Sequence, residues 1–319
     1  MNIIGETLFF GCNYVAKRHL CITENNTNTI IKQIHITKAV YIMKWKIISD
    51  SSCDLMKKDV ACDEVDFTTI PFILNIGNDE YIDNENLDVD KMITAMESCA
   101  TACSSACPSP ASWLDEYDDA ENAIAITISS NLSGSHNSAV VAKEMVTDQN
   151  KKVAILDSRS TGPELVICIE ELVKLIKSGL SFDEVVKKAN ETLAQTKTAF
   201  ALCSFDNLVK NGRMSRLTGF VARKLGMWGI GIATEQGTIS VTGKSRGPEK
   251  AISLIIGDMT ERGFTGERVV ISHCKNEPFA EKLKNSILEK WQNAEISFHE
   301  TRGLDSFYAE RGGIIIAYK

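Results

Sequence analysis

Short apolar segments of strand length alternate with longer segments of helical periodicity between residues 43 and 197. A chain with this alternation is expected to form a mostly parallel sheet with helices on both faces. The predicted strands are Lys46–Ser49, Thr68–Asn75, Ala123–Ile128 and Lys152–Asp157. The predicted helices are Asp88–Cys103, Ser109–Asp119, Ser135–Asp148 and Pro163–Ser178. Ligands of such folds bind at the carboxyl ends of the strands, so a site is expected in the turns that follow them.

Beyond about residue 197 the pattern becomes richer in strands, and a helix at Ser181–Gln195 precedes the change. The predicted strands are Thr198–Cys203, Gly229–Thr234, Thr238–Gly243, Arg268–His273, Glu295–Glu300 and Gly313–Tyr318. The predicted helices are Asn207–Asn211, Leu217–Lys224, Gly247–Arg262 and Glu277–Gln292. We therefore predict an α/β domain over 43–197 and an α+β domain over 198–319. The length of 319 residues agrees with two domains of roughly 150 residues each.

Residues 1–42 differ from the rest of the chain because they mix Asn, Thr and Ile without a clear period. Met43 is followed directly by a strand pattern that runs into a polar turn. We predict that Met43 is the natural start and that residues 1–42 are an upstream extension. A short domain-swapped or docking arm is the alternative.

Charge and cysteine content narrow the class of protein. The chain has 35 basic and 42 acidic residues, a formal net charge of −7, which argues against a nucleic-acid binder and against a polybasic membrane anchor. No apolar run approaches the ~20 residues that span a bilayer, and the N-terminus lacks the pattern of a secretory signal. The ten cysteines are expected to be reduced thiols, so the predicted location is cytoplasmic.

The segment Ile128–Ser135, Ile-Ser-Ser-Asn-Leu-Ser-Gly-Ser, carries the densest chemical signal. An apolar strand ends there in small hydroxyl residues, and a helix follows. Backbone amides at a helix start favour an anion such as a carboxylate or a phosphate, and Ser hydroxyls also donate. Ser and Asn are also good helix N-caps, so an anion site and an ordinary capped junction both stay open. The turn Asp50–Asp54 is a similar but weaker signal.

Two further constellations carry weaker alternatives. Ser133 is followed by His136 but lacks the G-x-S-x-G elbow, so a Ser-dependent acyl hydrolase that uses these two residues is a minority hypothesis. Cys99, Cys103 and Cys107 are spaced four apart, which is not a zinc or iron–sulfur pattern, so small buried side chains are favoured over a metal site. The sequence contains neither a P-loop nor a dinucleotide-binding fingerprint.

Seven motifs follow one another in a specific order and spacing. They are Ile48–Leu55, Ile128–Ser135, Leu156–Ser160, Phe205–Leu208, Asn211–Ser215, Lys244–Arg246 and Gly312–Gly313. In this order the chain resembles the DegV family, a bacterial fatty-acid-binding family, over about residues 43–319. The resemblance implies a two-domain protein that buries one long acyl chain between its domains.

By the same resemblance, the protein is expected to be the binding subunit of a fatty acid kinase. It would hold a long-chain fatty acid while a separate ATP-binding subunit phosphorylates the carboxylate, and the acyl phosphate would enter phospholipid synthesis. The chain would then have no catalytic centre, no metal and no cofactor, and the fatty acid would be its ligand. Transient contact with a membrane is compatible with this role.

The resemblance also implies which residues bind the carboxylate. Ser105 stands where the family has a carboxylate-binding Thr, and Ser133 stands at the second such position, with Ser129 and Ser130 nearby. Tyr308 stands where the family has a His before its last strand. A Tyr hydroxyl still donates to a carboxylate, but it does not titrate near neutrality as His does.

Two arginines, Arg213 and Arg246, match positions near the carboxylate mouth that help to engage the kinase. The family's polar residue after the Thr is replaced by Ala106. Because of Tyr308 and Ala106, a binder of another anionic amphiphile remains a third hypothesis.

The acyl chain would gain roughly 0.8 kcal/mol for each buried CH₂, so an apolar tunnel is sufficient for tight binding. Phe72, Ile73, Leu165 and Met227 are candidate lining residues. For each residue taken singly, an ordinary core position is the favoured interpretation.

Overall fold

The computed structural model describes residues 5–10, 14–20, 34–36, 43–215 and 227–319. The chain divides into two units, residues 1–43 and residues 44–319. The first unit contains an antiparallel three-stranded sheet that the sequence does not predict. Its strands are β1 (Gly5–Phe10), β2 (Tyr14–Leu20) and β3 (Ile34–Ile36). The natural start at Met43 stays a prediction.

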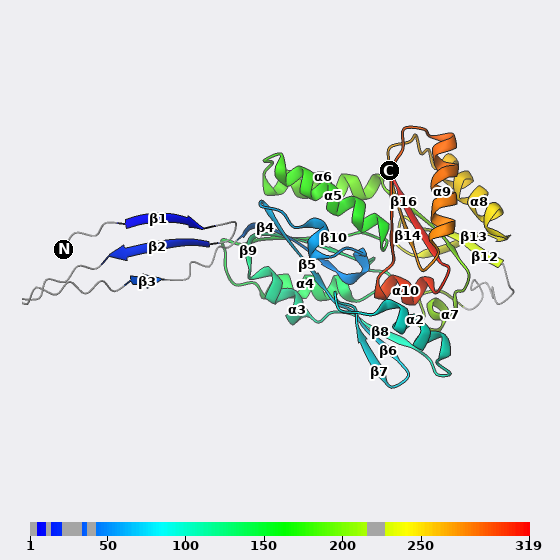
Figure 1. The fold of residues 1–319 in the computed structure, drawn as a ribbon, viewed down its shortest axis with the longest axis horizontal. Helices are drawn as coiled ribbons and strands as arrows, with labels where there is room; N and C mark the ends of the chain where they lie inside the picture. Colours follow the sequence, from blue (N-terminus) through cyan, green and yellow to red (C-terminus); the bar gives the residue numbers. More distant parts are fainter. Residues whose placement is uncertain (1–4, 11–13, 21–33, 37–42, 216–226) are drawn as a thin grey trace, which may run out of the picture. The chain divides into compact units, whose positions relative to one another are not determined.

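The first sheet of the second unit has the strand order β10-β9-β4-β5. Its strands are β4 (Met43–Asp50), β5 (Val65–Ile70), β9 (Ala120–Thr127) and β10 (Lys152–Asp157). β4 pairs with β5 and β10 pairs with β9 in parallel. One face is covered by α5 (Pro163–Lys177) and α6 (Phe182–Gln195), and the other by α3 (Pro110–Tyr117) and α4 (Ser135–Met145) (Figure 1). The predicted parallel sheet with helices on both faces is confirmed.

Alternation along β4 explains why this sheet has two buried faces. Trp45 and Ile47 pack with α5 and α6, whereas Ile48 packs with Trp113 and Tyr117 of α3. Successive side chains of a strand point to opposite faces, so a strand that is apolar at consecutive positions is buried on both.

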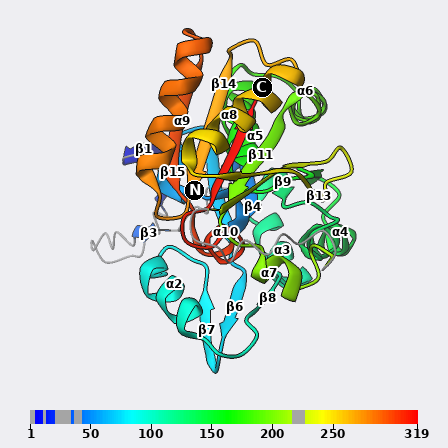
Figure 2. The same ribbon diagram turned by 90° about the vertical axis from the view of Figure 1, so that its right-hand side faces the viewer.

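The larger sheet has the strand order β13-β12-β11-β16-β14-β15. Its strands are β11 (Lys197–Leu202), β12 (Met227–Ala233), β13 (Ile239–Arg246), β14 (Arg268–His273), β15 (Glu295–Glu300) and β16 (Ile314–Tyr318). β14 and β15 are parallel, and the other neighbours are antiparallel. α8 (Pro248–Glu261) and α9 (Glu277–Lys290) cover one face (Figure 2). This strand-rich C-terminal domain confirms the predicted fold class.

Helix α5 packs against both sheets, because its apolar residues are distributed around the helix. Leu165 and Leu172 contact the first sheet, whereas Val166 and Ile167 pack against Val270 and Ala317 of the larger one. All residues from Pro163 to Ile169 are buried, so this half of the helix is covered on every side, whereas Lys174 and Lys177 further along are exposed. α5 therefore holds the two sheets at a fixed separation.

A small third sheet, β7-β6-β8, lies beside helix α10. It comprises β6 (Ile73–Ile76), β7 (Asp79–Ile82) and β8 (Ser104–Ala106). The remaining short helices are η2 (Ser51–Cys53), α1 (Lys57–Val60), α2 (Val89–Ser98), α7 (Asp206–Lys210) and α10 (Gly303–Ala309). α10 lies between the larger sheet and this small one in both views (Figures 1 and 2).

Two predicted elements are wrong in this region. The strand Thr68–Asn75 is two strands, β5 and β6, because Pro71 lies between them and has no N–H for a ladder hydrogen bond. The helix Asp88–Cys103 ends at Ser98, where Cys99 turns into an extended conformation, and the chain then forms β8. The predicted helix Leu217–Lys224 lies outside the described residues.

Among the described residues, no helix is long and apolar enough to cross a bilayer. Within the same ranges there is no cluster of three or more side chains of the types that ligate metals. The predicted domain boundary at residue 197 stays a prediction.

Candidate functional site

A pocket opens at the carboxyl ends of β9 and β10, where the sequence predicts a site. About 790 Å³ in and at the mouth of the pocket is free of protein atoms, with the open solvent at the mouth included. Its lining comes from the loops that follow β9 and β10, from the larger sheet, from β8 of the small sheet, and from α7, α10 and the segments beside them. The lining residues are Phe72, Ser105, Ile128, Leu132, Ser133, Ser160, Thr161, Thr198, Phe200, Leu202, Leu208, Arg213, Ala233, Gly237, Thr238, Ile239, Leu304, Asp305, Tyr308, Ala309 and Ile315.

Most of the wall is apolar. The apolar side chains come from elements that are far apart in the sequence, and most of them belong to one cluster that also contains Leu74 of β6 and Met92 of α2. Phe200 stacks edge-to-face on Phe205, with ring centroids 6.2 Å apart. Such a wall favours an apolar ligand and excludes water from it.

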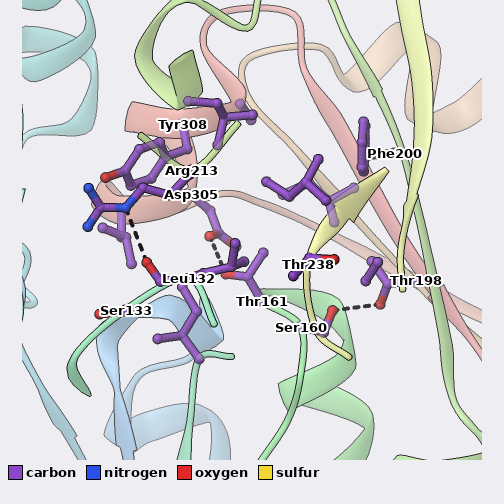
Figure 3. Close-up of a pocket in the computed structure, with 18 of the residues that line it drawn as sticks. Leu132, Ser133, Ser160, Thr161, Thr198, Phe200, Arg213, Thr238, Asp305 and Tyr308 are labelled. Atoms are coloured by element: carbon purple, nitrogen blue, oxygen red, sulfur yellow. Dashed lines mark hydrogen bonds between the residues drawn. The ribbon is translucent and has the colours of Figure 1, made fainter. Parts of the chain in front are cut away.

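One end of the pocket is polar. The Ser105 and Tyr308 hydroxyls form a hydrogen bond of 2.8 Å, although 203 residues separate them in the chain. The Arg213 guanidinium lies 5.8 Å from the centroid of the Tyr308 ring and donates to the carbonyls of Leu132 (3.1 Å) and Asn211 (2.6 Å). In Figure 3, Arg213, Ser133 and the Tyr308 hydroxyl gather on one side of the lining.

The charges at this end are unequal. Burial raises the pKa of Tyr308, and the neighbouring Ser105 and Arg213 only partly oppose this effect. Tyr308 is therefore a neutral hydrogen-bond donor, and Arg213 supplies the positive charge. Neutral hydroxyl donors beside one guanidinium are suited to a carboxylate or another monoanion.

Asp50 holds the loop that carries Ser133. Its buried carboxylate accepts hydrogen bonds from the hydroxyls of Ser52 (2.5 Å) and Ser135 (2.6 Å) and from the amide of Ile128 (3.1 Å). Burial raises the pKa of Asp50, and these donors oppose that shift. The loop therefore uses its donors on the protein's own carboxylate. The local anion at this junction is Asp50, and Ser133 remains on the pocket side.

A second group of carboxylates surrounds the start of α10. Asp83 accepts the amides of Gly303 (2.9 Å) and Leu304 (2.8 Å), and Asp54 accepts the amide of Arg302 (2.7 Å). These contacts join the first sheet and the small sheet to α10. They fix the helix that presents Tyr308 to the pocket.

Asp305 lies on α10 in the pocket wall and accepts a 2.6 Å hydrogen bond from Thr161. Its second oxygen and one oxygen of Asp54 are both buried without a donor. The two oxygens face the same spot, because a Cβ added at Gly162 would collide with Asp305 Oδ2 and lie 3.2 Å from Asp54 Oδ2. Burial raises the pKa of Asp54 to about 7, and burial followed by the charge of Asp54 raises that of Asp305. A shared proton between these carboxyls satisfies both oxygens.

The opposite end of the pocket carries hydroxyl groups that donate to one another. Ser160 donates to Thr198 (2.8 Å), and Thr198 donates to Glu164 (2.7 Å), which is buried. Burial raises the pKa of Glu164 to about 7. Figure 3 places Ser160 and Thr198 on the side away from Arg213. These hydroxyls have their hydrogen-bond partners within the protein, and they form the closed end of the pocket.

The structure brings together four of the predicted site residues: Ser105, Ser133, Arg213 and Tyr308 all line the pocket. Among the candidate tunnel residues, Phe72 lines it as well.

The other predicted residues lie elsewhere. Ser129 is buried and donates to the Gly237 carbonyl (2.6 Å), whereas Ser130 is exposed and donates to Asp157 (2.6 Å). The lining of the pocket includes neither serine hydroxyl. Arg246 is exposed at the end of β13.

Three candidate tunnel residues also lie outside the lining. They are Ile73, Leu165 and Met227. Leu165 is part of the core under the first sheet.

The close contact between Ser129 and Gly237 explains why a glycine stands in the turn between β12 and β13. Gly237 has φ +75°, and a Cβ there would collide with the Ser129 hydroxyl. Only glycine allows the β12–β13 turn to approach the first domain this closely. Ser129 therefore closes the pocket by holding this turn in place.

The structure does not bring together the residues of the two alternative sites, the Ser133–His136 pair and the three cysteines. His136 is bonded to the Thr127 hydroxyl (3.1 Å), and the Ser133 hydroxyl accepts the Ser135 amide (3.2 Å). Ser133 and His136 line different cavities. The expectation that Cys99, Cys103 and Cys107 are buried holds for Cys103 alone, because α2 ends before them.

Sequence reasoning missed Thr161 and Asp305. Thr161 follows a predicted strand, so its position at a carboxyl end was a usable signal. Asp305 carried no such signal, because an isolated Asp among apolar residues has many explanations until its partner Asp54 is seen.

Comparisons with known proteins agree with this architecture. The family model described as "Uncharacterised protein, DegV family" matches residues 44–319. A DegV domain-containing protein of Streptococcus pyogenes serotype M1 is 41% identical over 279 residues, covering 87% of this chain and 100% of that protein. One from Streptococcus gordonii is 40% identical over 280 residues, covering 87% and 99%. The chain belongs to the DegV family.

Solved structures extend the similarity to three dimensions. The fatty acid kinase B3 protein of Streptococcus pneumoniae, loaded with linoleic acid, superposes with a TM-score of 0.84 at 38% identity, covering 87% of this chain and 99% of that one. A DegV family protein from Eubacterium eligens, loaded with heptadecanoic acid, has a TM-score of 0.82 at 30% identity, covering 86% and 99%.

Proposed function

We propose that this protein binds one long-chain fatty acid, with the acyl chain in the apolar pocket and the carboxylate at the end formed by Ser105, Ser133, Arg213 and Tyr308. The observation that carries the proposal is a pocket with an apolar wall and a single cationic, hydroxyl-rich end. At roughly 0.8 kcal/mol per buried CH₂, the wall supplies most of the affinity. The two relatives with bound fatty acids support the same reading.

The Ser105 and Tyr308 hydroxyls are hydrogen-bonded to each other in this structure. In the bound state, the ligand carboxylate replaces this contact as the hydrogen-bond partner of both hydroxyls. Both hydroxyls then donate to it, and Arg213 balances its charge. Because Tyr308 stays neutral, carboxylate binding is expected to change little between pH 6 and pH 8 through this residue.

The proposal includes a partner. The protein presents the carboxylate to a separate ATP-binding kinase subunit and has no catalytic centre or cofactor of its own. Support comes from the name of the pneumococcal relative and from the two arginines, one at the polar end and one, Arg246, exposed on β13. A cytoplasmic location, transient membrane contact and a domain boundary at residue 197 belong to the same proposal.

The first test is native mass spectrometry of the purified protein, with extraction and identification of any lipid. A stoichiometric fatty acid adduct is expected. An apo mass that persists after incubation with fatty acids contradicts the proposal, and displacement only by other anionic lipids favours the amphiphile alternative.

The second test is Tyr308→Phe. Loss of one hydroxyl that donates to a carboxylate is expected to weaken fatty acid binding roughly tenfold. Tyr81→Phe, which removes a hydroxyl outside the pocket lining, is the matched control. Affinity is measured by titration with a fluorescent fatty acid. Equal affinities for the two variants would place the carboxylate elsewhere.

A further inference from the structure

Two thiols lie in the loop between α2 and β8 and share one backbone oxygen. Cys99 Sγ is 3.6 Å and Cys103 Sγ is 3.9 Å from the carbonyl oxygen of Thr101. The Thr101 hydroxyl lies 3.2 Å from Cys99 Sγ. The loop folds so that its two cysteines converge.

The two thiols have different environments. Cys99 is partly exposed, whereas Cys103 is 5% exposed and belongs to the apolar cluster around the pocket. Hydrogen bonding to the side chain and then to the backbone of Thr101 lowers the pKa of the Cys99 thiol, with a smaller contribution from Cys103. Burial raises the pKa of Cys103. One accessible, activated thiol beside one protonated thiol is the arrangement of a nucleophilic and a resolving cysteine.

We propose that Cys99 and Cys103 form a redox modification site that a hydroperoxide converts into an intramolecular disulfide. The Cys99 thiolate attacks the peroxide, the O–O bond breaks, and Cys99 becomes a sulfenic acid while one water leaves. The Cys103 sulfur then attacks the Cys99 sulfur, the S–O bond breaks, and a second water leaves. Two thiols are oxidised by two electrons and one hydrogen peroxide is reduced to two waters. A dithiol reductant reverses the change.

The site is connected to the polar end of the pocket through the backbone. Cys103 is two residues before Ser105. The carbonyl of Cys103 accepts a hydrogen bond from the Asn211 side chain (3.1 Å), and the Asn211 carbonyl accepts one from Arg213 (2.6 Å). Drawing the Cys103 sulfur out of its apolar cluster toward Cys99 therefore displaces groups that hold the carboxylate. Oxidation is expected to weaken fatty acid binding, an effect that rests on the proposed function.

The modification is tested without any ligand. The protein is treated with hydrogen peroxide, alkylated and cleaved after lysine. The peptide that follows Lys91 and ends at Lys143 contains Cys99, Cys103 and Cys107, and a loss of two hydrogens is expected in it. Cys107→Ser is the matched control and should retain this loss, whereas Cys99→Ser and Cys103→Ser should abolish it. Full alkylation of the cysteines after peroxide, or loss of the bridge in Cys107→Ser, overturns the proposal.

The coupling is tested by fatty acid titration of the Cys107→Ser protein, oxidised and then reduced with dithiothreitol. Affinity is expected to fall roughly tenfold on oxidation, as for the loss of one hydrogen bond to the carboxylate, and to recover on reduction. Cys99→Ser should not respond. An affinity that is the same in both states overturns the coupling. If the reduced protein binds no fatty acid while the disulfide still forms, the proposed function fails and the modification site stands.

Discussion

Asp50 and Asp54 lie four residues apart in one buried turn, yet the protein treats their carboxylates differently. Asp50 receives donors from Ser52, Ser135 and Ile128, all within the first domain. Asp54 receives one donor, the Arg302 amide, and turns its other oxygen toward Asp305 of α10. A carboxylate that stabilises one domain is fully hydrogen-bonded, whereas one at the contact between domains depends on a proton. The contacts of Asp50 hold one loop in place, whereas the contact between Asp54 and Asp305 depends on pH.

The largest expected effect in this comparison is that of Asp50→Ala. Three buried donors would lose their acceptor, and each unsatisfied donor costs about 1–3 kcal/mol, so we expect a loss of about 3 kcal/mol or more in the free energy of unfolding. The measurement is urea denaturation at neutral pH. Asp50→Asn keeps one oxygen and should lose less. A loss below about 1 kcal/mol for Asp50→Ala would show that the loop holds its shape without this acceptor.

A smaller change in the free energy of unfolding is expected from a change of pH and from Asp305→Asn. The pKa of Asp54 is about 7 in the folded protein and near its ordinary value of 3.8 in the unfolded chain. Between these values the folded state holds a proton that the unfolded state has lost. The free energy of unfolding should therefore fall as the pH rises from 4 through 7.

In Asp305→Asn, the amide can donate to Asp54 while its oxygen still accepts from Thr161. We expect this variant to lose the part of the pH-dependent fall that the Asp54–Asp305 pair causes, while the raised pKa of Glu164 leaves a smaller fall in both proteins. The variant should exceed the wild type at pH 8 by on the order of 1–3 kcal/mol, with little difference at pH 5. The exposed Asp115→Asn is the control. Parallel stability curves for the wild type and Asp305→Asn would rule out the shared proton.

The smallest effect is expected from Ser130→Ala. Ser130 donates to Asp157 in a solvent-exposed turn, so its removal should cost about 0.5 kcal/mol or less, as at most surface positions. Fatty acid affinity should stay unchanged, because the hydroxyl is outside the pocket lining. Urea denaturation and the fluorescent titration measure the two quantities. A tenfold loss of affinity would restore Ser130 as a carboxylate ligand.

The sequence predicted those elements whose formation depends on local periodicity. β10, β14 and β15 have the predicted bounds. β10 and β14 contain apolar runs, and β15 alternates apolar and polar residues, so each shows a local strand pattern. α10, β7 and β8 were not predicted, because these short segments do not extend over enough residues to show a periodic pattern. Their stability comes from contacts with distant residues, such as Asp83 with Gly303.

Candidate site residues divide along the same line. Ser105, Ser133, Arg213 and Tyr308 were named from motifs, and their convergence needed the fold. Ser129 satisfied the same motif and yet bonds to Gly237. Motifs record which residue types surround a site, but they do not record which way each hydroxyl points.

By itself, the sequence determined the order of strands and helices, the parallel first sheet and the strand-rich second half, because side-chain periodicity decides which face of an element is buried. Only the tertiary structure decided that Asp54 meets Asp305 and that Tyr308 meets Ser105. The members of each pair are more than two hundred residues apart in the chain, and their energies depend on burial and on distances of a few ångströms that no local pattern encodes.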